Sequence, residues 1–426
     1  MANKSTMTYT SFDPAPLRAL FPSLTLALDG HPAVFFDNPG GTQVPNTVVE
    51  AVADYYRNSN ANVGGAFATS RRTDAVVAGA RAAMADLLNA PGSETIVFGP
   101  SMTALTFHLA RSLAETIKPG DEVVVTTLDH DANVAPWLDL QVSGAVIRVV
   151  DIHPEDATLD MEGLEAALSP RTRLIAVSAA SNAVGTMPDI ARITRMAHEV
   201  GALVFIDAVQ FAPHSPVDVQ ALGCDFLACS AYKFFGPHMG VLYGRAEHLT
   251  SLTPHKVRPS KDAIPYRWES GTLNHEGLAG VTAAIDYLAD IGEKRGQSAL
   301  DRRQRLKTAM RAIRGYEQTL SRHLLEGLAG ISDITVYGLT DTSRLDERLP
   351  TVAFTWPRLS PRATAEYLAA RGFCVWSGNY YALGLMERLG LEERGGAVRV
   401  GLAHYNTTDE IDRMVAALQE VPKASA

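Results

Sequence analysis

The sequence is poor in cysteine and has no long apolar run. Its 426 residues include three cysteines, Cys224, Cys229 and Cys374, and none belongs to a CxxC pair. An odd, scattered set of this kind is typical of neither a disulfide framework nor a zinc site, and it favours a reducing cytoplasm. No apolar stretch is long enough to span a membrane, and the first residues lack the apolar core of a signal peptide. We therefore expect a cytoplasmic protein without a bound metal.

An excess of basic residues is also missing. Lysine and arginine number 38 against 47 acidic residues, which gives a net charge of −9. This balance disfavours nucleic acid and anionic membranes as main partners. No internal repeat or low-complexity tract is present. The length is sufficient for one large domain and a smaller one.

Apolar strands alternate with helical patterns through the first two thirds of the chain. Buried strands are predicted at 95–98, 122–126, 145–150, 174–178, 203–206 and 226–229, and helices at 73–88, 160–167 and 190–199. Such alternation indicates a mostly parallel sheet wrapped by helices, with ligands bound outside the carboxyl ends of the strands.

The last third of the chain has a different pattern. Long helices are predicted at roughly 293–328, followed by strands near 351–355, 374–377 and 398–401 and helices from 362 and 409. This order indicates a small α+β domain. We expect an arm at 1–32 that packs with the small domain, a large domain at 33–291 and the small domain at 292–426.

Asp207 and Lys233 are the strongest candidates for chemistry. Asp207 ends one buried strand, and Lys233 follows the next strand in a turn rich in glycine and proline. Pyridoxal 5'-phosphate (PLP) enzymes use this pair: a lysine holds the aldehyde as a Schiff base, and a carboxylate keeps the pyridine nitrogen protonated. Gln210 is placed to contact the phenolic oxygen of the ring. Ser230 and Tyr232 are placed to contact the phosphate through their hydroxyls. The alternative is a surface lysine beside an unrelated core aspartate.

Other polar residues are predicted at the same edge of the sheet. The turn after the strand at 95–98 leads into a helix, so Met102 and Thr103 are candidates to bind a phosphate, with a plain N-cap as the alternative. His130 follows the strand at 122–126 and could stack on a pyridine ring or act as a hydrogen-bonded loop residue. Asn182 follows the strand at 174–178. Their convergence on one edge favours a binding site.

A glycine turn follows a short strand near the N-terminus. Asn38 precedes Pro39, Gly40 and Gly41, and glycines allow backbone amides to approach a ligand closely. We expect Asn38 to contact substrate, although a plain tight turn fits the pattern equally well.

Taken together, the motifs from Phe35 to Thr407 resemble the class V aminotransferase family of fold-type I PLP enzymes, and most of all its group II cysteine desulfurases and their relatives. The resemblance implies a seven-stranded-type, mostly parallel sheet and a homodimer. It implies that Arg399 clamps the substrate carboxylate and that Thr272 reaches the phosphate of the other subunit. It gives the remaining candidates cofactor roles: Lys233 as Schiff base, Asp207 at the pyridinium, Gln210 at the phenolate, His130 stacked on the ring, Asn182 beside it, and Met102, Thr103, Ser230 and Tyr232 around the phosphate.

The chain departs from the desulfurase pattern in its loop at 378–384. Tyr381 stands where those enzymes have a nucleophilic cysteine, and Trp376 stands where an arginine is usual. Cys374 is expected to be a buried core thiol. We therefore expect a more aromatic pocket, with Trp376 and Tyr381 contacting substrate.

The resulting prediction is a PLP enzyme that acts on an amino acid. In the main prediction, Lys233 removes the proton at Cα and a β-substituent is then eliminated. Such an enzyme is a C–S lyase that forms no persulfide on a loop cysteine. The alternatives are an epimerase or transaminase of the same family, and a genuine cysteine desulfurase. The sequence leaves the substrate itself open.

Overall fold

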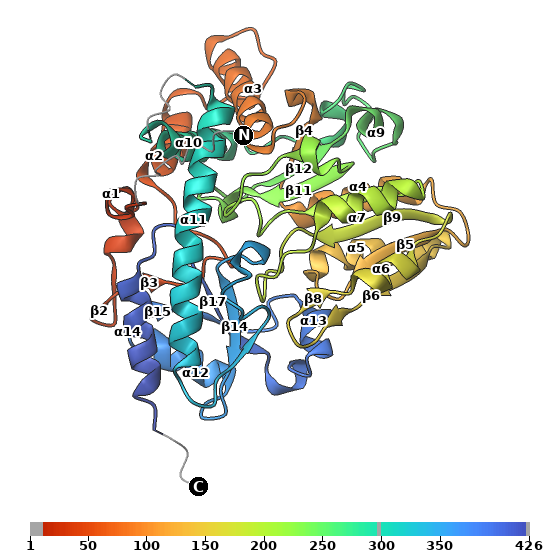
Figure 1. The fold of residues 1–426 in the computed structure, drawn as a ribbon. Coiled ribbons are helices and arrows are strands. Elements are labelled where there is room, and N and C mark those ends of the chain that lie inside the picture. The colour runs from red at the N-terminus through yellow and green to blue at the C-terminus, as the bar shows by residue number, and fades with distance from the viewer. Residues whose placement is uncertain (1–11, 296–299, 423–426) are drawn as a thin grey trace, which may run out of the picture.

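A seven-stranded sheet forms the centre of the computed structural model, which describes residues 12–295 and 300–422 (Figure 1). Its strand order is β4 (Ile96–Gly99), β12 (Gly240–Gly244), β11 (Phe226–Ser230), β10 (Leu203–Asp207), β9 (Thr172–Ser178), β5 (Glu122–Thr126) and β6 (Val146–Val150). All neighbours are parallel except β12, which is antiparallel to both β11 and β4. The mostly parallel sheet predicted from the sequence is confirmed.

Helices cover both faces of this sheet. Successive strand residues alternate between two hydrophobic clusters, so that Val204 and Ile206 of β10 join one cluster and Phe205 joins the other. On the first face lie α3 (Ala68–Leu88), α6 (Met161–Ala167), α7 (Ile190–Glu199) and α10 (His275–Glu293). On the second lie α4 (Met102–Ala114), α5 (Ala135–Leu138) and α9 (Ala246–Ser251). Burial on both faces explains why the strands read as continuous apolar runs.

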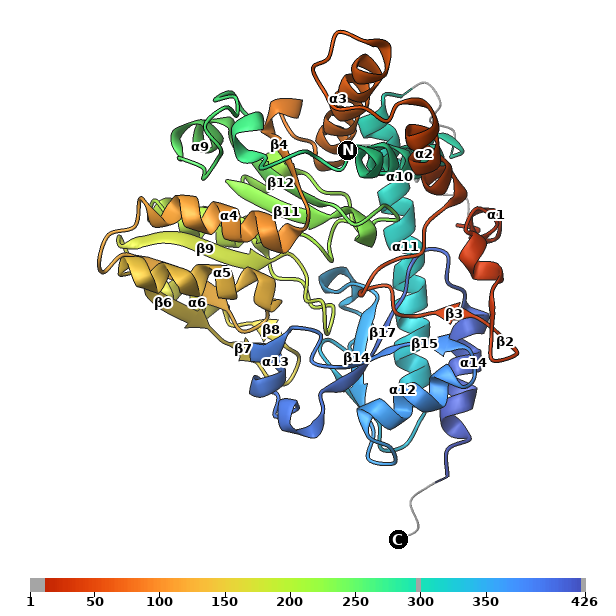
Figure 2. The same ribbon diagram turned by 180° about the vertical axis from the view of Figure 1, so that it is seen from behind.

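A smaller antiparallel sheet follows in the chain. Its order is β13 (Thr335–Tyr337), β14 (Thr351–Thr355), β17 (Ala397–Gly401) and β16 (Trp376–Gly378), and α12 (Pro361–Ala369) and α14 (Thr408–Gln419) pack against it. The single helix α11 (Arg302–Ala329) runs from the large sheet to this one (Figures 1 and 2). The small α+β unit matches the predicted architecture, while the boundaries at 32 and 291 stay predictions.

Most of the remaining elements are short. They are α1 (Ala15–Arg18), α2 (Asn46–Asn58), α8 (Val219–Leu222), α13 (Leu383–Arg388), β1 (Ala27–Leu28), β2 (His31–Pro32), β3 (Val34–Phe35), β7 (Ile152–His153), β8 (Thr158–Leu159) and β15 (Phe373–Cys374), together with several 3₁₀ turns. Of the predicted arm, residues 1–11 lie outside the described residues. Within the rest, Phe21 packs in the cluster of the large sheet, and Arg18 pairs with Glu410 of α14 at 2.8 Å.

The strand predicted at 374–377 is divided in two. Phe373 and Cys374 form β15, which pairs in parallel with β3, whereas Trp376 to Gly378 form β16, which pairs with β17 of the small sheet. The apolar pattern of the sequence carries no sign of this change of partner, because both halves are strand-like.

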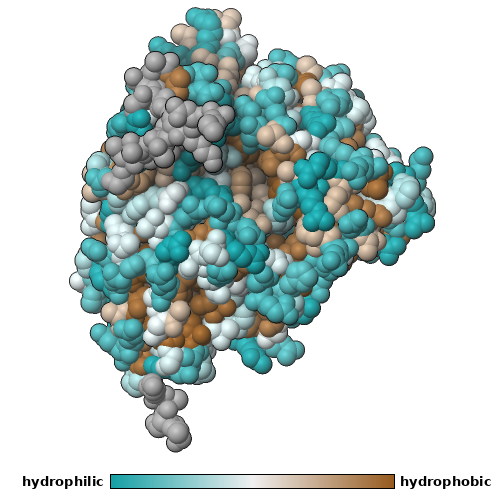
Figure 3. All heavy atoms as spheres, viewed as in Figure 1, coloured by the Kyte–Doolittle hydropathy of each residue, from teal (hydrophilic) through white to brown (hydrophobic). Residues whose placement is uncertain are grey.

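No helix among the described residues combines the length and the apolar character that a membrane crossing requires. Hydrophilic residues cover most of the face seen in Figure 3, and hydrophobic ones show in small groups between them.

A buried ion pair joins α3 to the edge of the sheet. Arg81 binds Glu269 through two hydrogen bonds of 2.8 and 2.6 Å, and Glu269 also accepts from the amide of Phe98 at 2.9 Å. Glu269→Gln leaves the Arg81 charge buried without its counter-ion, so we expect it to lower the free energy of unfolding by about 3–5 kcal/mol.

Urea denaturation measures this loss. The matched control is Glu50→Gln, which breaks the exposed Arg57–Glu50 pair and should cost no more than about 1 kcal/mol. Equal losses in the two variants would contradict the structural role of the buried pair.

Candidate active site

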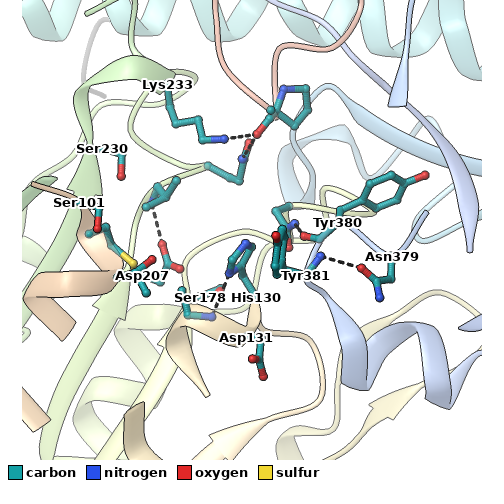
Figure 4. A pocket seen from close by; sticks show the side chains of 18 of the residues that line it. Ser101, His130, Asp131, Ser178, Asp207, Ser230, Lys233, Asn379, Tyr380 and Tyr381 are labelled. Carbon is teal, nitrogen blue, oxygen red and sulfur yellow. Dashed lines mark hydrogen bonds between the residues drawn. The ribbon is translucent and has the colours of Figure 1, made fainter. Parts of the chain in front are cut away.

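A cavity of about 950 Å³ lies where the carboxyl ends of the large sheet face the small sheet. The ends of β9, β10 and β11 line it from one side, and β16 and β17 line it from the other. Figure 4 shows side chains from both sides pointing into this space. Most of the predicted site residues line it, namely Met102, Thr103, His130, Asn182, Asp207, Gln210, Ser230, Tyr232, Lys233, Trp376, Tyr381 and Arg399.

Lys233 is buried directly after β11. Its Nζ donates to the carbonyl of Pro39, which also accepts from Nε2 of Gln210 at 2.8 Å, and it lies 4.6 Å from the centre of the Tyr232 ring. Burial, reinforced by the nearby charge of Arg399, lowers the pKa of Lys233 from 10.5 to about 7. A substantial share of this amine is therefore neutral near pH 7 and able to attack an aldehyde.

Asp207 ends β10 beneath the cavity. Its Oδ1 accepts from the amide of Val209 at 2.8 Å, and its other oxygen accepts no hydrogen bond from the described residues. Burial, with a smaller contribution from the Asp129 carboxylate, raises the pKa of Asp207 to about 7. A cationic N–H placed at the bare oxygen would stabilise the carboxylate, as a protonated pyridine does.

His130 presents its ring to the cavity. Its Nδ1 accepts from the amide of Ala132 at 3.0 Å, which fixes the ring, and burial lowers the pKa of His130 to about 4. The imidazole is therefore neutral at pH 7. It stacks on Tyr381 with ring centres 5.5 Å apart and planes inclined by 27°.

Tyr380 and Tyr381 occupy a conformation that bulky residues rarely adopt, with φ of 57° and 58°. Two hydrogen bonds from the large sheet's loops hold them: Asn182 Nδ2 donates to the carbonyl of Tyr380 at 2.8 Å, and the amide of Asp131 donates to the carbonyl of Tyr381 at 2.7 Å. The loop at 379–381 is thus fixed against the rim of the large sheet.

Arg399 enters the cavity from β17 and is buried. Its Nη1 donates to the carbonyl of Asn182 at 2.9 Å, and its guanidinium carbon lies 4.2 Å from the centre of the Tyr380 ring. Its Nε and the Oδ1 of Asn182 are buried without a partner among the described residues. Arg399 makes no ion pair in the part of the chain that the structure describes, so it can accept an anionic ligand such as a carboxylate.

The N-terminus of α4 faces the cavity through Met102 and Thr103. Ser101 caps the helix by accepting from the amide of Ala104 at 3.1 Å. Its side chain therefore does not accept from the amides of Met102 and Thr103. A Cβ at Gly240 would lie 2.2 Å from the carbonyl carbon of Ser101, so only glycine allows β12 this close to the turn. Free amides at a helix N-terminus suit a phosphate.

Asn38 and Thr272 do not line the cavity. The amide nitrogen of Asn38 donates to the carbonyls of Phe35 and Gly401 at 2.9 and 2.8 Å, and its oxygen accepts from Tyr405. This buried amide is committed to joining chain segments, and its placement does not support contact with substrate. Thr272 is exposed, and the single chain places no second subunit beside it.

Phe107 and the carbonyl of Pro39 are among the contributors to the cavity that were not predicted from the sequence. Phe107 lines it, and its position one helical turn after Thr103 was a usable signal, since both lie on one face of α4. The carbonyl of Pro39 accepts from Lys233 and Gln210. It left no such signal, because every residue has a backbone carbonyl and the sequence does not show which one will be used.

A mostly parallel seven-stranded sheet with a buried lysine and aspartate at its carboxyl edge is the arrangement of fold-type I PLP enzymes. The sequence pattern of the family described as Aminotransferase class-V matches residues 34–414. The chain belongs to this family, whose members use PLP, and the prediction of that cofactor is confirmed.

Individual relatives within this family point to a narrower activity. The chain is 34% identical to a cysteine desulfurase of Klebsiella pneumoniae (strain 342), covering 97% of this chain and 99% of the relative, and 32% identical to that of Pectobacterium atrosepticum over 95% and 97%. Among solved structures it resembles the cysteine desulfurase CsdA of Escherichia coli (TM-score 0.82, 30% identity, 97% and 99% covered). It also resembles the cysteine desulfurase of Thermococcus onnurineus NA1 (TM-score 0.84, 28% identity, 96% and 97% covered).

These likenesses correct the predicted reaction. The C–S lyase prediction is wrong, because full-length relatives at about a third identity are cysteine desulfurases, and they support the desulfurase alternative instead. The prediction gave too much weight to Tyr381. One side chain at the rim says less about the reaction than the many positions that the whole chain shares with its relatives.

The depressed pKa of Lys233 has a measurable consequence. The rate at which the apoenzyme captures PLP, followed as borohydride-fixed cofactor, should rise with pH and level off above about 7, because the neutral amine is the nucleophile. Arg399→Met removes a positive charge that favours the neutral amine, so the midpoint should move to higher pH. A midpoint near 10.5 in the unmodified enzyme would contradict the burial of this amine.

The Tyr380 ring should strengthen binding at Arg399 by holding the guanidinium in place. We expect Tyr380→Leu to weaken the binding of a carboxylate ligand by roughly tenfold, since a desolvated cation–π contact is worth up to about 2 kcal/mol. Tyr380→Phe keeps the ring and loses only the hydrogen bond to the Ala397 carbonyl, so it serves as the control. Calorimetry with acetate as the probe measures both, and equal affinities in the two variants would refute the contact's role.

Proposed function

We propose that this chain is a cysteine desulfurase, which removes the sulfur atom of L-cysteine and leaves L-alanine. The observation that carries the proposal is its likeness to cysteine desulfurases over nearly the full length of both chains. The cavity is consistent with a small amino acid, because Arg399 offers a carboxylate site across from the amine of Lys233.

When bound, PLP supplies an electron sink for negative charge at the substrate's Cα. In this proposal Lys233 holds the cofactor's aldehyde and, once released from it, moves the proton at Cα. Asp207 would accept the protonated pyridine nitrogen at its bare oxygen, and the neutral His130 ring would cover one face of the pyridine. Gln210 would contact the ring oxygen, and Asn182 would lie beside the ring with its free Oδ1.

The phosphate is assigned to the turn at the start of α4. The amides of Met102 and Thr103 and the hydroxyls of Thr103, Ser230 and Tyr232 would bind it. The substrate carboxylate would bind the fork of Arg399. Trp376 and Tyr381 line the side of the cavity through which substrate enters.

We also propose a homodimer in the cytoplasm. The unpaired state of all three cysteines is consistent with a reducing compartment. The exposed position of Thr272 leaves it accessible to a second subunit, where it would reach that subunit's phosphate.

Incubation of the holoenzyme with L-cysteine and 2-mercaptoethanol should yield L-alanine, measured by amino-acid analysis. Lys233→Ala should lower the rate on the order of 10³-fold or more, because the amine that moves the proton is lost. Lys118→Ala, at an exposed lysine that does not line the cavity, is the matched control and should not change the rate. Formation of pyruvate and ammonia in place of alanine would contradict the proposal.

A further inference from the structure

The three cysteines of the chain all lie in the described residues, and none of them lines the cavity. Cys229 of β11 and Cys224 just before that strand are buried in the hydrophobic cluster on one face of the large sheet, where burial raises the pKa of both thiols, that of Cys224 to about 12. Cys374 is half-buried in β15, and burial together with the Asp37 carboxylate raises the pKa of its thiol to about 11. A thiol must be ionised and within reach to attack a sulfur atom, and these three are neither.

The cavity is nevertheless open at the side of the small sheet. Trp376 and Tyr381 both line it, although 52% and 72% of their surfaces are exposed, so they mark its mouth. Tyr381 is held there by the amide of Asp131 and by stacking on His130. The Trp376 indole lies against Gly40, where a Cβ would come within 2.6 Å of its Nε1.

The cavity is also large. Its volume of about 950 Å³ is near the upper end of the range for ligand pockets, about 300–1,000 Å³. A cavity of this size that is open at its mouth is compatible with a third reactant that enters there. The reacting sulfur would lie inside, near the buried Lys233 and Arg399, so the third reactant has to pass the aromatic rings of Trp376 and Tyr381. This geometry favours a small molecule over a side chain on a protein surface.

We propose that the sulfur acceptor is a low-molecular-weight thiol that enters the cavity between Trp376 and Tyr381. The inference rests on the proposed desulfurase function, which requires an acceptor, and on the placement of the chain's own thiols outside the cavity.

The reaction balances without an added oxidant: L-cysteine and RSH give L-alanine and the persulfide RSSH. The acceptor thiolate forms a bond to the substrate's Sγ while the Cβ–Sγ bond breaks, and the electron pair of that bond remains on Cβ. The proton that the acceptor lost on ionisation is matched by the one that Cβ gains. The two sulfur atoms together are oxidised by two electrons, and the carbon is reduced by two.

The test uses the holoenzyme, a low concentration of L-cysteine labelled with ³⁴S, and 2-mercaptoethanol as the acceptor. We expect the initial rate of alanine formation to rise in proportion to the thiol concentration. The persulfide of 2-mercaptoethanol, trapped by alkylation and identified by mass spectrometry, should carry the label. The pH at which the rate levels off should move when a more acidic thiol is used, because the thiolate is the nucleophile.

Cys374→Ser and Cys374→Ala serve as controls and should show the same dependence on thiol. Alanine formed at a rate independent of thiol, or in a single turnover without thiol that leaves a sulfur atom on the protein, would overturn this inference while the desulfurase function stands. Absence of alanine with every thiol would instead overturn the proposed function.

Discussion

The burial of two cations in one cavity is the constraint on which the site depends. Lys233 and Arg399 are both buried, and neither forms an ion pair with the described residues. Isolated charges are costly in such a place. The structure offsets the cost with the Pro39 carbonyl and the Tyr232 ring at Lys233, and with the Asn182 carbonyl and the Tyr380 ring at Arg399. The same arrangement keeps the lysine partly neutral and the arginine available to an anion.

The turn after β3 joins the parts that supply these groups. Asp37 forms a bridge with Gly401 of the small sheet, and Pro39 packs so closely on Gly401 that a Cβ there would lie 2.0 Å from it. The carbonyl of Pro39 meanwhile holds Lys233 and Gln210 of the large sheet. The network around Asn38 secures the turn itself. A segment near the N-terminus therefore contacts both the strand that carries Arg399 and the side chain of Lys233.

The sequence was sufficient for the fold class and for the edge of the sheet where the cavity lies. Apolar strands ending in polar residues, such as the one that ends at Asp207, can be recognised because burial on both faces leaves only the end free for chemistry. Features that depend on the backbone could not be predicted. They are the hydrogen bond that the carbonyl of Pro39 accepts from Lys233, the positive φ of Tyr380, and the change of pairing strand after Cys374. The assigned residue roles stay predictions. The reaction was misjudged because it depends on the whole cavity, and Tyr381 alone does not define it.

Helix α11 belongs to both hydrophobic cores. Its first half contributes Leu306 and Ile313 to the cluster of the large sheet, and its second half contributes Leu320 and Leu328 to that of the small sheet. Its 28 residues correspond to about 42 Å of continuous helix. Helices form cooperatively, so one half cannot melt without exposing the end of the other. Loss of either core thus weakens the other, and the two sheets should lose their structure in a single thermal transition.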